Sequence, residues 1–546
     1  MGSQTRLEKV EKIKALWDRP QHRLSNLMGG PARVRVVVLL AAVLSLSSAD
    51  TGTVGAIAPE LETAFHLSNT QLGLLITASS LVGALAALPM GVIADRTQRV
   101  RALAITVVLW AGGMVASGAS TSYLMLLLMR LALGLVTAAS GPFVASLTGD
   151  LFPAKERSRI YGMILTGELL GAGAGLIVSA DIAEFSSWRL PFFLFSLPSL
   201  ALAYAMHRLL PEPARGGQSW LRPGDEKVKP AEEAEASANG QGAASAVEDA
   251  EVRRKARRRK DIHPRPGLVL KKDPTAMAPW DAALYILRIP SNLVLIASSV
   301  LGYFFLAGLR SFAVIFAEAH YQVSQSAVTG VFVFIGAGAI AGTLIGGRLV
   351  DRSVHRGRID ARVLFAGASF VAAAAAFLPG LASTDLLVAV PLYTVAAIFL
   401  SAPNPALDAA RLDVVPSRLW GRGEGVRTFF RSVLEAVAPV TFGVVSGVLG
   451  GPQASGLGTG VNSGRGGVHI PQAQSRGLEY TFMIMLVPLL ASGILLLLRR
   501  HAYLRDVATA DMSDCKVFGG CDDDGGGREG IGERSPGAGR PEGGRP

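Results

Sequence analysis

Hydrophobic positions along this chain gather into long runs that polar residues rarely interrupt. The runs at 34–46, 72–90 and 293–309 reach or approach the roughly 20 residues that a helix needs to cross a bilayer. In lipid only helices and closed barrels satisfy all their backbone hydrogen bonds, and these runs do not alternate as barrel strands do. The pattern therefore predicts an all-α polytopic membrane protein.

Twelve such spans are expected, in two groups of six. The first group is placed at 34–58, 70–93, 101–119, 123–147, 159–182 and 188–209. The second group is placed at 291–317, 326–349, 361–380, 385–409, 424–449 and 479–499. The expected fold is a pseudo-symmetric pair of six-helix bundles, each helix crossing the bilayer once.

The rest of the chain is expected to contribute little packed structure. Residues 1–33 form a cationic N-terminal segment, either an interfacial anchor or a solvated tail. Between the bundles 34–210 and 291–500, the linker 211–290 is rich in Ala, Glu and Gly and should be largely disordered. We expect the same of a Gly-rich outer loop at 450–477 and of the tail 501–546.

The distribution of charged residues predicts which loops between the spans lie on the cytoplasmic side. The chain has 546 residues, 50% of them hydrophobic and 17% charged, and a net charge of +11. Its Lys and Arg lie in alternate loops between the spans, which the positive-inside rule places in the cytoplasm, so we expect no nucleic-acid partner. Both termini and the linker should be cytoplasmic. We expect a multi-pass protein of the plasma membrane, and a monomer.

One short turn occurs in both halves, between spans two and three and between spans eight and nine. The first copy carries Gly91, Asp95, Arg96 and Arg99, and the second carries Gly347, Asp351 and Arg352. A repeated turn at equivalent places indicates an internally duplicated membrane protein.

These turns resemble the signature of the major facilitator superfamily, over about 34–210 and 290–500. The resemblance implies a secondary transporter that works by alternating access, with Asp95 and Asp351 latching a cytoplasmic gate. A loop with merely topogenic charge is the alternative. Arg130-Leu-Ala-Leu-Gly134 in span four is similar to the family's arginine motif, and the glycines from Gly167 to Gly175 in span five are similar to its antiporter motif.

Two subgroups of that superfamily are considered. The glycines of span five look like those of drug:proton antiporters, although Ala172 stands where a proline is usual. Arg130 together with the segment 150–159 looks like Spinster-type lysolipid transporters, although Thr137 replaces an acidic residue of that group.

Charged residues within spans are expensive and mark functional pathways. In the first half, Asp50, Arg130 and Glu168 are the candidates for proton coupling. A desolvated carboxylate at Asp50 or Glu168 can exchange a proton, and Arg130 needs a buried acidic partner. The alternatives are a structural hydrogen bond at Asp50 and an arginine that reaches the outer interface.

In the second half, the candidates for substrate binding are Arg310, Phe305, Arg431 and Glu435. Arg310 among phenylalanines can hold an anionic head group beside an apolar body. The repeats place Glu168 and Arg431 at equivalent positions, so they are expected either to pair across the two halves or to pair separately, Arg431 with Glu435 one turn away.

The interpretation is a proton-coupled exporter of a hydrophobic or amphipathic small molecule, drug-like or a lysolipid. Alternatives are a proton-coupled importer or uniporter of a small organic anion, and a membrane receptor or scaffold that does not transport. An enzyme is not expected, because the eight histidines fall in loops or at span ends and no nucleophile or metal set appears. No cofactor or metal is expected.

Overall fold

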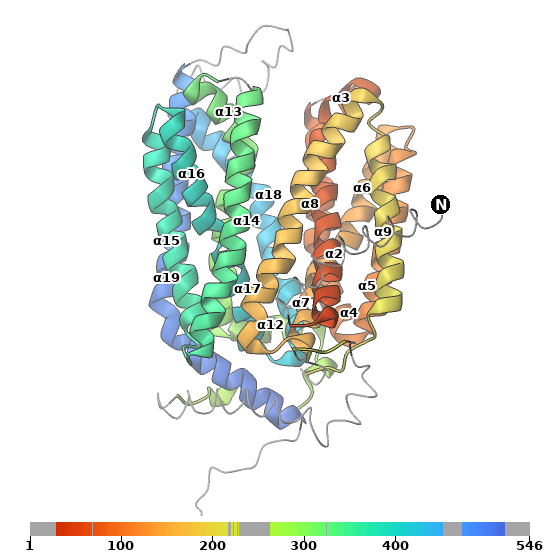
Figure 1. The fold of residues 1–546 in the computed structure, drawn as a ribbon, viewed down its shortest axis with the longest axis vertical. Coiled ribbons are helices and arrows are strands. Elements are labelled where there is room, and N and C mark those ends of the chain that lie inside the picture. The colour runs from red at the N-terminus through yellow and green to blue at the C-terminus, as the bar shows by residue number, and fades with distance from the viewer. Residues whose placement is uncertain are drawn as a thin grey trace, which may run out of the picture.

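The computed structural model describes residues 29–67, 69–216, 262–323, 325–450 and 472–518, with a few positions between 220 and 228. The chain forms two helical bundles that lie side by side (Figure 1). The loop expected at 450–477 and the end of the tail fall mostly outside the described residues, as do 1–28.

The first bundle follows the span prediction closely. Its helices are α2 (Pro31–Ala56), α3 (Ala58–Phe65), α4 (Asn69–Arg96), α5 (Arg99–Gly118), α6 (Tyr123–Thr137), α7 (Ser140–Leu151), α8 (Arg157–Phe185) and α9 (Leu190–Leu209). The fourth span is divided between α6 and α7, near Pro142, whose ring removes one helical hydrogen bond.

The second bundle repeats this layout. Its helices are α13 (Pro290–Tyr321), α14 (Gln325–His355), α15 (Ala361–Ala382), α16 (Leu386–Ser401), α17 (Pro403–Val414), α18 (Trp420–Gly450) and α19 (Gln472–Phe518). The tenth span is divided at Ala402, directly before Pro403, so the breaks in the two halves correspond.

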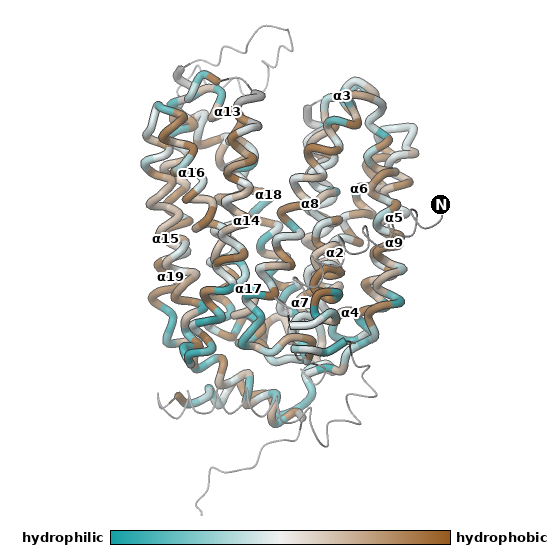
Figure 2. Tube along the Cα trace, viewed as in Figure 1, coloured by the Kyte–Doolittle hydropathy of each residue, from teal (hydrophilic) through white to brown (hydrophobic). Residues whose placement is uncertain are grey.

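Twelve helical segments of the described chain are long and apolar enough to cross a membrane, which confirms the predicted fold class. Figure 2 shows hydrophobic residues along the length of the bundles, with hydrophilic residues gathered towards their lower ends. That end carries the turns around 97–98, 152–156, 356–360 and 415–419, and is called the basic end below.

The backbone supports the repeat independently. Among the described residues, two non-glycine residues have positive φ: His66, at 52°, and Gln322, at 54°. They end α3 and α13 in left-handed C-cap positions. Each is the second residue of one of two segments with similar sequences, Phe65–Gly73 in the first half and Tyr321–Gly330 in the second. The duplication therefore extends to an uncommon backbone conformation.

Two segments expected to be disordered are folded. Within the linker, residues 262–288 form the short turns Pro266–Leu268 and Pro274–Ala276 and the helix α12 (Pro279–Arg288). The tail is helical as far as Phe518, because α19 continues past its span and runs beneath the second bundle (Figure 1). Asp506 of this extension accepts hydrogen bonds from Ser291 N and Arg265 Nε, at 2.8 and 2.7 Å.

Candidate functional site

Asp95 joins the two bundles at the basic end. Its Oδ1 accepts a hydrogen bond from Gly421 N at 2.8 Å, and its Oδ2 accepts one from Arg422 N at 3.0 Å. Both donors belong to the first turn of α18, whose free N–H groups carry a partial positive charge. A carboxylate of α4 in the first bundle thus caps a helix of the second.

Asp351 makes the reciprocal contact. Its two carboxylate oxygens accept hydrogen bonds from Ser158 N at 3.3 Å and Arg159 N at 2.6 Å, at the start of α8. Asp95 and Asp351 are both buried, at 2% and 4% exposure. The two caps form a crossed, pseudo-symmetric pair of contacts between the bundles at the basic end.

Gly91 and Gly347 explain how the helices come close enough for these caps. A methyl group at Gly91 would lie 2.6 Å from the carbonyl oxygen of Gly421, and one at Gly347 would overlap the carbonyl oxygen of Ser158. Neither neighbour is a flexible side chain, so only glycine fits.

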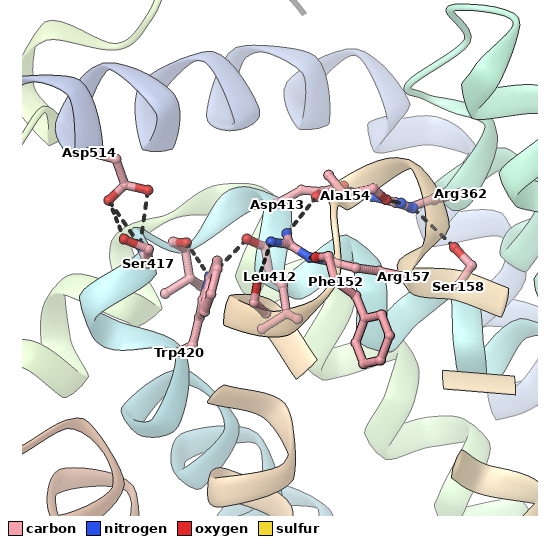
Figure 3. A network of polar contacts seen from close by, with 12 residues as sticks. Phe152, Ala154, Arg157, Ser158, Arg362, Leu412, Asp413, Ser417, Trp420 and Asp514 are labelled. Carbon is pink, nitrogen blue, oxygen red and sulfur yellow. Dashed lines mark hydrogen bonds and ion pairs between the residues drawn. The ribbon is translucent and has the colours of Figure 1, made fainter. Parts of the chain in front are cut away.

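Arg99 lies at this end but holds its own bundle together. Its fully buried guanidinium pairs with Asp150 and, through Nε, with Glu212 Oε1 at 2.9 Å. The equivalent residue of the second half is Arg362, which pairs with Asp413 and donates to Ala154 O of the first half (Figure 3). Arg362 was not predicted from the sequence, although Asp150-Leu-Phe-Pro153 and Asp413-Val-Val-Pro416 are matching segments of the two halves.

The two remaining turn residues differ in their surroundings. Arg96 is exposed and donates to the carbonyls of Thr275, at 3.1 Å, and Met277, at 3.0 Å, both in the linker. Arg352 is also exposed. In the described part of the chain, the hydrogen bonds to the linker are therefore made by Arg96 and not by Arg352.

A second inter-bundle contact lies beside the caps. The Arg157 guanidinium lies 4.8 Å from the ring centroid of Trp420, whose Nε1 donates to the carbonyls of Leu412 and Val415 at 2.9 and 3.0 Å (Figure 3). Arg157 Nη1 also approaches Asp413 Oδ1 at 3.6 Å. This cation–π contact joins α8 to α18.

Asp50 and Arg130 were predicted as functional residues because a charge within a membrane span is energetically costly. In the structure they form an ion pair with each other. Arg130 donates from Nη1 to Asp50 Oδ1 at 2.6 Å and from Nη2 to Oδ2 at 3.0 Å. The side chains are 4% and 2% exposed. Arg130 Nε is buried and has no hydrogen-bond partner among the described residues. The pair lies inside the first bundle and links α2 to α6.

Glycines of span five pack α8 against α2, next to that pair. A methyl group at Gly167, Gly171 or Gly175 would overlap backbone oxygens of α2, whereas one at Gly173 would meet nothing within 4 Å. Two hydroxyls cross the same contact, Ser179 Oγ donating to Thr53 Oγ1 at 2.9 Å. Small residues at four-residue spacing bring membrane helices together in this way.

A cavity of about 250 Å³ lies mainly within the second bundle and reaches α8 of the first. Its charged lining residues are Glu168 and Arg310, among aromatic and aliphatic side chains that include Phe305. Phe305 is fully buried and meets Phe377 edge to face, with ring centroids 5.2 Å apart. An apolar chamber with a carboxylate and a guanidinium suits an amphipathic ligand.

Arg431 pairs within its own helix, as one of the two alternatives predicted. Its Nε lies 3.4 Å from Glu435 Oε2, and its guanidinium lies over Tyr303, 4.0 Å from the ring centroid. No ion pair between Arg431 and Glu168 occurs in the described part of the chain. Glu168 lines the cavity beside Tyr303.

A buried charge cluster between α17 and α18 was largely missed. Glu424 accepts from Arg427 Nε at 3.1 Å and lies 3.1 Å from Arg411 Nη2, which also pairs with Asp408. From the sequence, Asp408 at the end of span ten is expected to belong to a cytoplasmic charge cluster with Arg411, whereas Glu424 and Arg427 are not predicted. The i,i+3 spacing of Glu424 and Arg427 is the signal that was available.

The Major Facilitator Superfamily profile matches residues 40–439. Among solved structures, a bacterial homolog of the human lysosomal transporter Spinster, inward-facing and occupied, has 20% identity and a TM-score of 0.54, covering 87% of this chain and 98% of its own. The human organic anion transporter MFSD10 (TETRAN) has 17% identity and a TM-score of 0.57, covering 85% of this chain and 100% of its own.

Proposed function

Because the chain belongs to the major facilitator superfamily, a family of membrane transporters and not of enzymes, we propose that it is a proton-coupled exporter of a hydrophobic or amphipathic small molecule. The observation that carries the proposal is the crossed pair of caps, Asp95 on α18 and Asp351 on α8. The two caps close the interface between the bundles at the basic end. The cavity lies further from that end than the caps do.

Alternating access requires that the helix caps made by Asp95 and Asp351 can break and form again. The bundles meet through side chains and helix ends that are not covalently joined, so rocking one bundle against the other separates both caps together. Each helix cap contributes about 0.5–2 kcal/mol, small enough for a bound ligand to offset. In the closed arrangement the cavity faces away from the basic end.

The basic end is assigned to the cytoplasm. The loops at this end carry the excess of Lys and Arg, whereas those near 59–69 and 381–385 carry none. The arrangement described is then outward-facing, in a plasma membrane with both termini inside. The same assignment makes Asp95 and Asp351 a cytoplasmic gate.

Proton coupling is assigned to Asp50 and Arg130. The carboxylate is buried, and its ionised form is stabilised by two hydrogen bonds from one arginine. A proton arriving at Asp50 would cancel that attraction and leave Arg130, whose Nε has no hydrogen-bond partner in the described part of the chain, free to bind another acceptor. Protonation of Asp50 would thereby change the charge balance around Arg130, and this is the step that we propose to couple proton movement to the rocking of the bundles.

The substrate class is inferred from the cavity. Phe305, Phe316, Phe377 and other apolar side chains line most of it, while Glu168 and Arg310 offer opposite charges. An apolar body with one polar head group, as in a lipophilic drug or a lysolipid, fits this lining. The similarity to the structure of a Spinster homolog accords with this choice.

A second candidate is the import, or the uniport, of a small organic anion. It is favoured by Arg310, an exposed cation on the cavity wall that can bind a carboxylate or sulfonate. Similarity to a solved organic anion transporter points the same way.

The test is transport in proteoliposomes. A panel of lipophilic cations, lysolipids and organic anions would be followed in uptake and efflux, with and without an imposed pH gradient. We expect at least one amphipathic compound to move against its gradient when protons flow the other way. If no transported compound responds to the pH gradient, proton coupling is wrong.

A further inference from the structure

Helix α12 has an apolar side that no part of the described protein covers. Its inner side, Ala282, Tyr285 and Ile286, is buried against the second bundle. One helical turn apart on the outer side, Trp280 and Leu284 are 70% and 37% exposed. A helix that faced water would carry polar residues there, so this side calls for an apolar neighbour.

The position of α12 identifies that neighbour. A single residue, Ile289, separates the end of α12 from Pro290, where α13 begins its membrane span. The helix is therefore held at the depth of the lipid head groups, where tryptophan is favoured. Exposed cations at Lys271 and Lys272, before the helix, and at Arg288, in its last turn, can attract anionic phospholipids.

The chain just before α12 crosses the basic end. We call residues 273–277 the strap. Arg96 of the first bundle donates to the carbonyls of Thr275 and Met277, and Arg422 of the second donates to those of Pro274 and Thr275, at 3.1 and 3.0 Å. The strap is therefore held by both bundles at once.

A third arginine fixes the start of the strap. Arg418 pairs with Asp273, whose other oxygen accepts from Thr275 N at 2.9 Å. Although burial alone would raise it, the pKa of Asp273 is lowered by the hydrogen bonds from Thr275 and by Arg418. The carboxylate is ionised at neutral pH, and the ion pair persists there.

We propose that α12 docks its Trp280–Leu284 side into the bilayer interface and thereby holds the strap across the closed basic end. The bilayer is then a partner that stabilises the closed gate. Arg96 and Arg422 belong to α4 and α18, the helices joined by Asp95, so the strap cannot keep both partners when that joint opens. The effect of the strap on the gate rests on the proposed alternating access, whereas the docking of α12 into the bilayer rests on the fold alone.

Docking can be measured with tryptophan emission. The protein would be reconstituted in phosphatidylcholine–phosphatidylglycerol bilayers with ordinary or brominated acyl chains, and the emission lost in Trp280→Phe taken as that of Trp280. We expect bromine to quench at least half of it. Trp420→Phe is the control, because its ring is 5% exposed and lies between the bundles. Equal Trp280 emission in both lipids would show that its partner is water or another protein, and would overturn the docking.

The effect on the strap can be measured by hydrogen–deuterium exchange in the same bilayers. Leu284→Glu should raise exchange several-fold in peptides covering 270–288 and 420–426, whereas Leu284→Phe should exchange like the unaltered protein. Unchanged exchange in Leu284→Glu would contradict the hold on the gate. Neither measurement uses a substrate. A negative result in either one therefore leaves the proposed transport function standing, and an absence of transport leaves the proposed docking standing.

Discussion

Asp95 and Asp351 each cap a helix in the bundle opposite their own, Asp95 on α18 and Asp351 on α8. The duplication therefore produces a joint in which each half contributes one carboxylate and one helix N-terminus. Because the two contacts lie at the same end of the interface, opening that end has to break both.

Asp95→Ala is expected to favour opening of the basic end. Losing the cap on α18 costs the closed state about 0.5–2 kcal/mol, which changes the closed-to-open ratio about two- to thirty-fold. Exchange of the amides in the first turn of α18 should rise accordingly. Asp351→Ala should do the same at the start of α8. Unaltered exchange in both variants would contradict the latch.

Gly91→Ala is expected to prevent the closed arrangement, because its methyl group meets the backbone of α18. Gly73→Ala is the matched control on the same helix, where a methyl group meets nothing within 4 Å. In the second half, Gly347→Ala and Gly330→Ala form the same comparison on α14. Transport should fall strongly in Gly91→Ala and Gly347→Ala only. Equal loss in all four variants would point to a general effect of alanine.

Gly171→Ala is expected to destabilise the first bundle. Overpacking costs about 1–3 kcal/mol, more than the roughly 0.5–1 kcal/mol that alanine gains over glycine in a helix. Gly173→Ala lies two residues away in open space and should be neutral or slightly stabilising. Thermal unfolding in detergent would show the difference. A lower melting temperature for Gly173→Ala than for Gly171→Ala would contradict the packing described.

The spans were predictable because each depends on its own local composition. The sequence predicted that Arg130 needs a buried acidic partner, because a buried charge requires an opposite one, and Asp50 is that partner. The repeat also gave Asp95 and Asp351 equivalent places before any contact was known.

What sequence could not supply were contacts between distant segments. Arg362 was missed because the second turn is longer than the first, which hides its equivalence to Arg99. Residues 262–288 and 501–518 lie at the edges of a linker and a tail whose overall compositions are typical of disorder, and they are folded because they bind each other, Arg265 N donating to Thr509 Oγ1 at 2.9 Å. No local pattern encodes that pairing.

Glu168→Gln is expected to weaken substrate binding about tenfold, the effect of losing one charge-assisted hydrogen bond. Glu184→Gln, on an exposed part of the same helix, is the control. Arg431→Gln should also reduce transport, because it leaves Glu435 without its ion-pair partner and removes the guanidinium from the Tyr303 ring. Concentration dependence of transport would measure both. Full activity in Glu168→Gln and Arg431→Gln would remove these residues from the mechanism.

Proton coupling through Asp50 can be tested by the response of Asp50→Asn to a pH gradient in proteoliposomes, for a compound that the unaltered protein transports. Since a buried arginine without its partner costs about 3–5 kcal/mol, the double variant Asp50→Asn/Arg130→Gln is measured alongside as a fold-preserving companion. If Asp50 couples protons to transport, the imposed pH gradient should drive transport in the unaltered protein. In both variants the compound should move only down its own concentration gradient. Transport that an imposed pH gradient still drives in the variants would contradict proton coupling through Asp50.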